Sequence, residues 1–113
     1  MADKLYALRI TRRTKQSVRE IAYYIRDELK APEASVAWVL RIRSGIKSLQ
    51  TFPTKIQLTP EDPWRDLGVR RKPVGNFYIY FLVFEELSLI RVIDVIYQRR
   101  EQIMSLRDTP LEV

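Results

Sequence analysis

The stretch from Phe77 to Phe84, which reads Phe-Tyr-Ile-Tyr-Phe-Leu-Val-Phe, limits the possible folds of this chain more than any other feature. It is rich in aromatic and β-branched residues and is bounded by Gly75-Asn76 and by Glu85-Glu86, which is typical of a β-strand. Because the side chains on both of its faces are apolar, we expect this strand to lie at the centre of a sheet that is covered on both sides. Helices can cover one face, and the other face is left for function.

Two further strands are predicted on either side of this central strand. Val69–Val74 precedes it across Gly75-Asn76, and Leu89–Tyr97 follows it after Glu85–Ser88. Both connections are short enough for hairpins, so the last third of the chain predicts a three-stranded antiparallel meander. The order of these strands would bring cations and tyrosines together on one sheet.

The first half of the chain predicts one strand followed by two helices. Lys4–Ile10 alternates in polarity as a half-buried strand does, and Thr11 offers an N-cap for the first helix. Ala31-Pro32-Glu33 ends that helix and starts the second, because Pro and Glu suit a first helical turn. The second helix runs toward Thr51 and stops at Phe52-Pro53. The expected core residues are Tyr6, Leu8 and Ile10 in the strand, Val18, Ile21, Ala22, Ile25 and Leu29 in the first helix, and Val39, Ile42, Ile46 and Leu49 in the second.

These elements predict an α+β fold in which a helical hairpin packs on one face of a twisted, mainly antiparallel sheet. The region Thr54–Asp66, with two prolines and no clean period, is interpreted as a surface loop whose Trp64 folds back onto the body. A short final helix is expected at Glu101–Arg107. With 113 residues, the chain is expected to form one domain, residues 1–113.

Composition narrows the possible chemistry. The chain has 20 Lys and Arg residues against 14 Asp and Glu residues, a net charge of +6 that favours an anionic partner. It has no histidine and no cysteine, so a zinc site and thiolate chemistry are not expected, and neither a metal nor a cofactor is predicted. The longest apolar run is far below the roughly 20 residues that span a bilayer. We therefore expect a cytoplasmic protein without a membrane partner.

The candidate binding residues lie in the last third of the chain, where cations and phenols are dense. Charges on an edge strand also prevent sheet-to-sheet aggregation, and aromatic residues on a central strand are often core, so each residue has a structural alternative. Adjacent residues on a strand point to opposite faces, so only one of the two final arginines is expected to face the functional surface. The candidates are Arg70, Arg71, Lys72, Tyr78, Tyr80, Tyr97, Arg99 and Arg100. A second basic group, Arg12, Arg13, Lys15 and Arg19, opens the first helix and is interpreted as a solvated face or a weaker binding candidate.

The order and spacing of several segments resemble the RelE/ParE toxin superfamily of bacterial toxin-antitoxin systems, also called plasmid stabilisation proteins. The segments are Tyr6-Ala-Leu-Arg-Ile, Ile21-Ala-Tyr-Tyr-Ile, Pro32-Glu33-Ala34 with Trp38, Ile46-Lys-Ser-Leu-Gln-Thr-Phe-Pro, Pro73-Val-Gly-Asn-Phe-Tyr-Ile-Tyr-Phe and Arg91-Val-Ile-Asp-Val-Ile-Tyr-Gln-Arg-Arg-Glu. The Pro-Glu-Ala opening and the Phe-Pro helix stop are more similar to the ParE branch.

The resemblance implies a small toxin that is held inactive by a cognate antitoxin, whose C-terminal segment wraps the sheet and hydrophobic grooves. ParE-like members inhibit DNA gyrase by protein binding, and growth arrest by that route is the leading expectation. RelE-like members cleave messenger RNA on the ribosome, and here such chemistry would use Arg71, Tyr97 and Arg99. A non-toxic relative that only forms an antitoxin complex is a third possibility.

Two positions depart from the pattern of RelE-like nucleases. Tyr97 stands where many relatives carry His, and Asp94 stands where relatives often carry a basic residue. These departures remove an acid-base candidate and add a negative charge where phosphate would bind. Asp94 is instead expected to pair with a nearby arginine.

Overall fold

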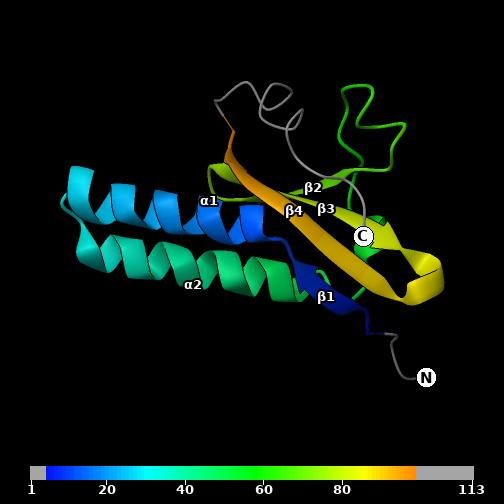
Figure 1. Ribbon diagram of the computed structural model, residues 1–113, viewed down its shortest axis with the longest axis horizontal. Helices are drawn as coiled ribbons and strands as arrows, with labels where there is room; N and C mark the ends of the chain where they lie inside the picture. The colour runs from blue at the N-terminus through cyan, green and yellow to red at the C-terminus, as the bar shows by residue number, and fades with distance from the viewer. Residues whose placement is uncertain (1–4, 99–113) are drawn as a thin grey trace.

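The computed structural model describes residues 5–98, which form two helices and a four-stranded sheet (Figure 1). The predicted helix Glu101–Arg107 and the candidates Arg99 and Arg100 lie outside the described residues. In chain order the main elements are β1 (Ala7–Ile10), α1 (Arg12–Tyr23), its π-helical extension η1 (Tyr24–Glu28), α2 (Pro32–Ser48), β2 (Arg70–Val74), β3 (Phe77–Phe84) and β4 (Leu89–Tyr97). Short 3-10 turns, η2 (Pro53–Lys55) and η3 (Glu85–Leu87), follow α2 and β3.

The sheet has the order β1-β4-β3-β2. The last three strands form the predicted antiparallel meander, and the apolar strand β3 lies between β4 and β2 as expected. β1 pairs in parallel with β4, from Ala7 opposite Leu89 to Ile10 opposite Val92, so the sheet is mixed. The basic strand β2 lies at the opposite edge of the sheet from β1.

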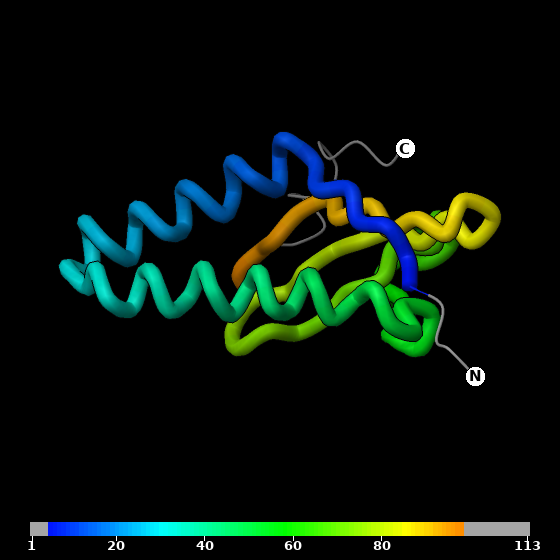
Figure 2. Tube along the Cα trace, turned by 90° about the horizontal axis from the view of Figure 1, so that it is seen from below, coloured from blue at the N-terminus to red at the C-terminus, as the bar shows by residue number. Residues whose placement is uncertain are grey.

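Both helices lie on one face of the sheet, and their common end projects beyond it (Figures 1 and 2). Thr11 is the N-cap of α1, as predicted: its hydroxyl accepts a hydrogen bond of 3.1 Å from the Thr14 backbone N–H. Pro32 opens α2 as predicted, and that helix ends at Ser48, short of Thr51. Among the helices of residues 5–98, none combines the length and apolar character needed to cross a membrane.

Buried side chains form one cluster on each face of the sheet. The larger cluster lies between the helices and the sheet and includes Ile42, Phe81 and Val92. The smaller cluster lies on the opposite face, where Trp64 from the long loop packs against Tyr80 and its neighbours. Trp64 is 7% exposed, which confirms that the loop folds back onto the body. The helices therefore cover one apolar face of β3, and this loop covers the other face.

Two expected core residues are exposed instead. Ile10 is 39% exposed because it ends the short edge strand β1, where the chain turns into α1. Leu29 is 56% exposed because it follows η1 in the part of the hairpin that extends past the sheet. Leu29 follows the helical spacing of the apolar residues before it, but the sheet does not extend beneath this part of the hairpin.

Candidate functional site

A groove of about 910 Å³ lies between the outer end of the helical hairpin and the end of β4. One wall comes from α1, η1 and Leu29 and has polar residues beside its apolar ones, and the other wall comes from β4 and the first residue of β3. The lining residues are Arg13, Ser17, Glu20, Ile21, Tyr24, Ile25 and Leu29 from the helical side, and Phe77, Asp94, Val95, Ile96 and Tyr97 from the sheet.

The groove exists because β1 is shorter than β4. β1 ends at Ile10, opposite Val92, whereas β4 continues to Tyr97. Along residues 94–97 of β4, no strand of the described chain lies on the side away from β3, and α1 and η1 run there instead. A strand edge beside an apolar helix wall is a surface on which an extended or helical peptide can pack.

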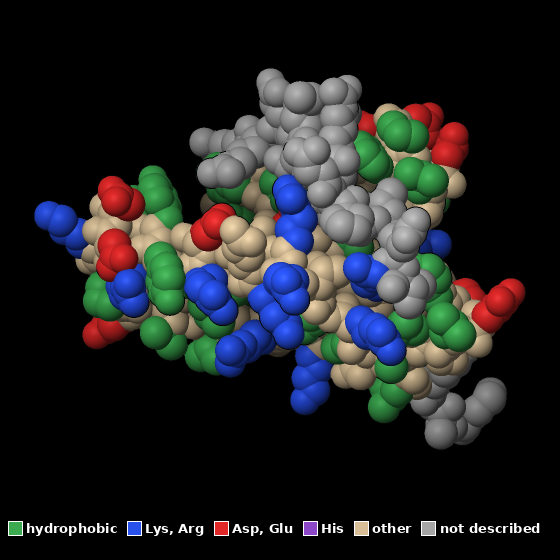
Figure 3. Space-filling model, in the orientation of Figure 1, with side chains coloured by type: hydrophobic (Ala, Val, Ile, Leu, Met, Phe, Trp, Pro, Cys, Tyr) green, Lys and Arg blue, Asp and Glu red, His purple; other side chains and the backbone are tan. Residues whose placement is uncertain are grey.

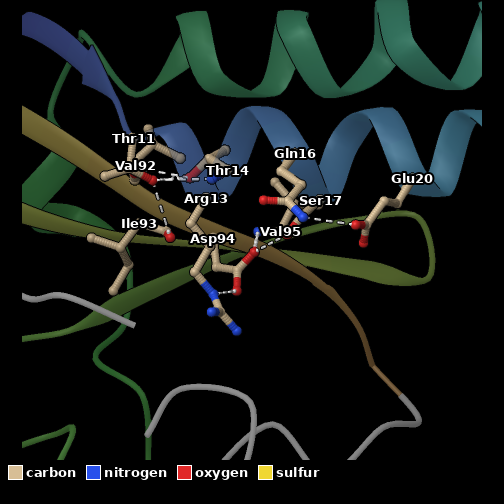
Figure 4. A network of polar contacts seen from close by, with 10 residues as sticks. All are labelled: Thr11, Arg13, Thr14, Gln16, Ser17, Glu20, Val92, Ile93, Asp94 and Val95. Carbon is tan, nitrogen blue, oxygen red and sulfur yellow. Dashed lines mark hydrogen bonds and ion pairs between the residues drawn. The ribbon is translucent and has the colours of Figure 1, made fainter. Parts of the chain in front are cut away.

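A polar network fixes α1 to β4 at one end of the groove (Figure 4). The Asp94 carboxylate is 2% exposed and accepts hydrogen bonds from Arg13 Nε at 3.0 Å, from Ser17 Oγ at 2.6 Å and from the Val95 backbone N–H at 2.8 Å. Thr14 Oγ1 donates to the Val92 carbonyl at 3.0 Å. The expected pairing of Asp94 with an arginine is thus confirmed, and the arginine is Arg13.

Tyr97 belongs to an aromatic row on the helix side of the sheet. Its ring centroid lies 5.3 Å from that of Phe77, and the Phe77 centroid lies 5.1 Å from that of Trp38 on α2. Trp38 is buried in the core between helices and sheet. Tyr97 therefore presents its ring to the groove and does not share a face with Tyr78 and Tyr80, whose side chains pack on the opposite side.

Arg71 is the one cation of β2 that lies with those two tyrosines. Its guanidinium carbon is 4.2 Å from the centre of the Tyr78 ring, and its Nη1 is 4.0 Å from Glu61 Oε2 on the long loop. The Tyr78 and Tyr80 ring centroids are 6.0 Å apart in an edge-to-face arrangement. The loop that carries Glu61 and Trp64 covers this cluster of Arg71, Tyr78 and Tyr80. The cluster is therefore less exposed to solvent than an open sheet face would be.

The Tyr80 side chain is fully buried. Its hydroxyl has no hydrogen-bond partner within residues 5–98. Burial raises the pKa of the Tyr80 phenol to about 12, and the nearby cation Arg71 opposes this rise without reversing it. In this structure Tyr80 is a core residue.

Arg70 and Lys72 lie toward the helix side, because their cross-strand partners Phe81 and Ile79 belong to the core under the helices. Arg70 donates a hydrogen bond to the Ile56 carbonyl, and Lys72 Nζ donates one to Ser48 Oγ. The structure therefore separates the candidates. Arg71, Tyr78 and Tyr80 form one group, Arg70 and Lys72 lie along the edge near α2, and Tyr97 lines the groove.

Sequence reasoning did not identify the helical wall of the groove. Tyr24 is 55% exposed and lines it together with Leu29. The sequence feature that could have identified this wall is the Tyr23-Tyr24 pair beside the apolar residues of the first helix. Tyrosine is frequent where one side of its ring packs against protein and the other side meets water. Within residues 5–98 no group of three or more carboxylates could hold a metal ion.

Comparison with known proteins gives one matching family and several similar structures, of which two are described here. The model of the family "ParE toxin of type II toxin-antitoxin system, parDE" matches residues 8–102. The chain is similar to a structure of the chromosomal ParDE toxin-antitoxin system from P. aeruginosa, with a TM-score of 0.66 and 22% identity, covering 83% of this chain and 97% of that one. It is also similar to the toxin-antitoxin complex RelBE2 from Mycobacterium tuberculosis, with a TM-score of 0.59 and 13% identity, covering 88% and 100%. No curated protein matches the sequence.

Proposed function

The chain belongs to the ParE toxin family of type II toxin-antitoxin systems, and from this premise we propose that it arrests growth by binding and inhibiting DNA gyrase. A cognate antitoxin would hold it inactive. Inhibition by binding needs a surface and no reacting group, which suits a chain whose candidate cations on β2, Arg70, Arg71 and Lys72, make contacts within its own fold.

The separation of Arg71 from Tyr97 is the observation that carries this proposal against the nuclease alternative. Cleavage of RNA needs an acid-base group and a cation at the same phosphate. Arg71 lies on the loop-covered face, whereas Tyr97 lines the groove on the helix side. The salt bridge between Asp94 and Arg13 at the end of that groove adds a carboxylate where a phosphate would have to bind.

The groove is the surface that we assign to the antitoxin. Its apolar wall contains Ile21, Tyr24, Ile25 and Leu29, and its other wall is a strand end without a strand neighbour in the described part of the chain. A peptide that places apolar side chains against Tyr24 and Leu29 would bury surface that is now exposed. The two similar structures contain toxins in complex with antitoxins, which supports a partner of this kind.

Inducing the protein without its antitoxin and following two readouts tests the proposal. We expect growth arrest together with a DNA-damage response, and no codon-positioned cuts in messenger RNA. Cuts without a DNA-damage response would favour the ribosome-dependent nuclease, and absence of growth arrest would favour the non-toxic relative.

Three variants at matched expression sharpen this test. Tyr97→Phe keeps the ring and should leave toxicity nearly intact, whereas Arg99→Ala and Arg100→Ala should weaken it if they contribute charged contacts to the target. Arg43→Ala, at an exposed position of α2, is the control for loss of a cation. If Tyr97→Phe abolished transcript cleavage while the protein remained folded, the loss, typically on the order of 10²-fold or more for an acid-base group, would identify a nuclease.

A further inference from the structure

The outer side of α1 and the adjoining sheet edge carry a group of cations that we call the α1 basic face: Arg12, Lys15 and Arg19 on the helix, and Arg9 and Arg91 on the strands. Figure 3 shows Lys and Arg side chains gathered across the middle of this side of the molecule, while acidic side chains lie mainly toward its ends. All of the five except the half-buried Arg91 are exposed. Within residues 5–98 none of them forms an ion pair.

The backbone holds these cations in a fixed arrangement. Arg12, Lys15 and Arg19 follow one another at three- and four-residue spacing, so they lie on one side of α1 over roughly 10 Å of its axis. Arg9 and Arg91 are partners in the β1–β4 register and share one sheet face. Only two residues separate Arg9 from Arg12, so their Cα atoms are at most about 11 Å apart.

This arrangement is unfavourable for the isolated protein. The first turn of α1 contains no acidic residue, and the positive end of the helix dipole lies beside Arg12 and Lys15. By contrast, Arg13 pairs with Asp94 and Arg26 pairs with Asp27. Within residues 5–98, no carboxylate therefore pairs with the cations of the α1 basic face, and their charge suits an external anion.

We infer that the α1 basic face binds the phosphate backbone of duplex DNA without reading its sequence. None of its five residues is aromatic, and the ring of the neighbouring exposed Tyr23 already stacks on Arg26, whose guanidinium carbon lies 4.6 Å from the ring centre, so the face lacks the row of open aromatic rings that single-stranded nucleic acids use. Cations repeated along a rigid helix match the repeated charges of a duplex backbone, for which lysine and arginine supply the affinity. The groove is lined by Ile21, Tyr24 and Ile25, which lie on a different side of α1, so this binding rests on no part of the proposed gyrase inhibition.

Fluorescence anisotropy of the full chain with a labelled 20-base-pair DNA duplex of arbitrary sequence, measured over a series of salt concentrations, tests the inference. The test variant combines Arg12→Gln, Lys15→Gln and Arg19→Gln. The control combines Arg43→Gln, Lys47→Gln and Arg65→Gln, which removes the same charge from exposed positions elsewhere. Circular dichroism verifies that both variants are folded.

We expect the wild type to bind with an affinity that falls steeply with salt. The test variant should lose roughly 10-fold or more in affinity at low salt, and the slope of log K against log salt should decrease by about 2 to 3, as the loss of three phosphate contacts requires. The control should keep the wild-type slope. Equal losses in both triple variants, tighter binding of a single-stranded RNA of the same length, or equal binding of polyglutamate would overturn the inference, as would absence of DNA binding by the folded wild type.

Discussion

At the scale of single residues, Tyr80 is one of four buried side chains within residues 5–98 whose polar atom has no hydrogen-bond partner, together with Trp38, Thr59 and Trp64. It lies opposite Arg71 in the β2–β3 register, yet its buried hydroxyl has no hydrogen-bond partner within residues 5–98. A buried hydroxyl without a partner lowers stability, because its interaction with water is lost and not replaced. Asp94 is the opposite case, since three donors surround its buried carboxylate.

Replacing Tyr80 with Phe should leave the free energy of unfolding at pH 7 unchanged or raise it by about 1 kcal/mol, since the ring stays and only the unsatisfied hydroxyl is lost. The variant should also change the response to alkali. Because the pKa of Tyr80 is about 12 in the folded protein and near 10 in the unfolded chain, the unfolded chain loses this proton first, and stability falls between those pH values. Urea denaturation at pH 8, 10 and 12 should show that the wild type loses on the order of 2–3 kcal/mol more than Tyr80→Phe over this window. If the free energies of unfolding of the wild type and of Tyr80→Phe changed equally with pH, the result would contradict the burial of an unpaired Tyr80 phenol.

Replacing Asp94 with Ala should lower the free energy of unfolding by about 2–4 kcal/mol, because Ser17 and the Val95 N–H lose their acceptor and Arg13 loses its ion pair. Urea denaturation at pH 7 measures this change. Asp27→Ala is the matched control, since Asp27 also pairs with an arginine but is exposed, and it should have little effect. A similar loss in both variants would mean that the Asp94 network adds nothing beyond a surface ion pair.

Among the elements, α2 lies close against the sheet at Gly45. A Cβ atom on Gly45 would lie 2.8 Å from Val74 Cγ2 and 3.0 Å from Ile79 Cδ1, closer than side chains tolerate without a shift. This contact lets α2 pack directly on β2 and β3. Glycine in the middle of a helix costs about 1 kcal/mol in propensity, and the close packing is the reason that a glycine fits here.

Gly45→Val should therefore destabilise the protein by about 1–3 kcal/mol more than Ser44→Val, since both place the same β-branched residue in α2 but only Gly45 faces the sheet. Thermal or urea unfolding of the two variants provides the comparison. Equal stability of the two would show that α2 can move away from β2 at no cost.

The whole molecule is asymmetric, because the helical hairpin is longer than the sheet it covers (Figure 1). Its projecting part leaves Tyr24 and Leu29 exposed, and both line the groove beside β4. Val36 and Leu40 are also exposed, on the side of α2 outside the groove lining. Exposed apolar side chains at one end of a small protein are characteristic of a binding surface.

The double variant Tyr24→Glu with Leu29→Glu should weaken binding of the antitoxin encoded beside this protein by at least about 100-fold, because two charges would be buried in the complex. Val36→Glu with Leu40→Glu, on the exposed side of α2 and outside the groove lining, should have a much smaller effect. Isothermal titration calorimetry of the refolded toxin variants measures both affinities. If the two double variants bound equally well, the antitoxin would not occupy the groove.

We also expect the toxin to be poorly soluble when produced without its antitoxin, because the same apolar end stays uncovered. Coexpression with the neighbouring gene should restore solubility, and size-exclusion chromatography would detect the complex. A stable, soluble monomer whose yield did not depend on the neighbour would argue against a partner-covered surface.

The sequence by itself determined the elements and their layers, because these follow from local periodicity and turn chemistry. The apolar run Phe77–Phe84 identified the central strand, Thr11 identified the start of α1, and Pro32 that of α2. Trp64 was predicted to fold back onto the body, and it is buried there. Asp94 was predicted to pair with an arginine, and it pairs with Arg13.

Only the tertiary structure decided which residues share a face and where a surface is hollow. Short connections predicted the order of the last three strands, but local patterns do not show which strand β1 pairs with, so the parallel pairing of β1 with β4 and the early end of β1 were not accessible from the sequence. Those two facts create the groove and place Tyr97 in it. The registers of β2 with β3 and of β3 with β4 put Tyr97 and Arg71 on opposite faces of the sheet. The same holds for Leu29, whose helical period was correct but whose burial depended on how far the sheet extends beneath the hairpin. The groove therefore depends on contacts between residues that are far apart in the chain, which local sequence patterns do not specify.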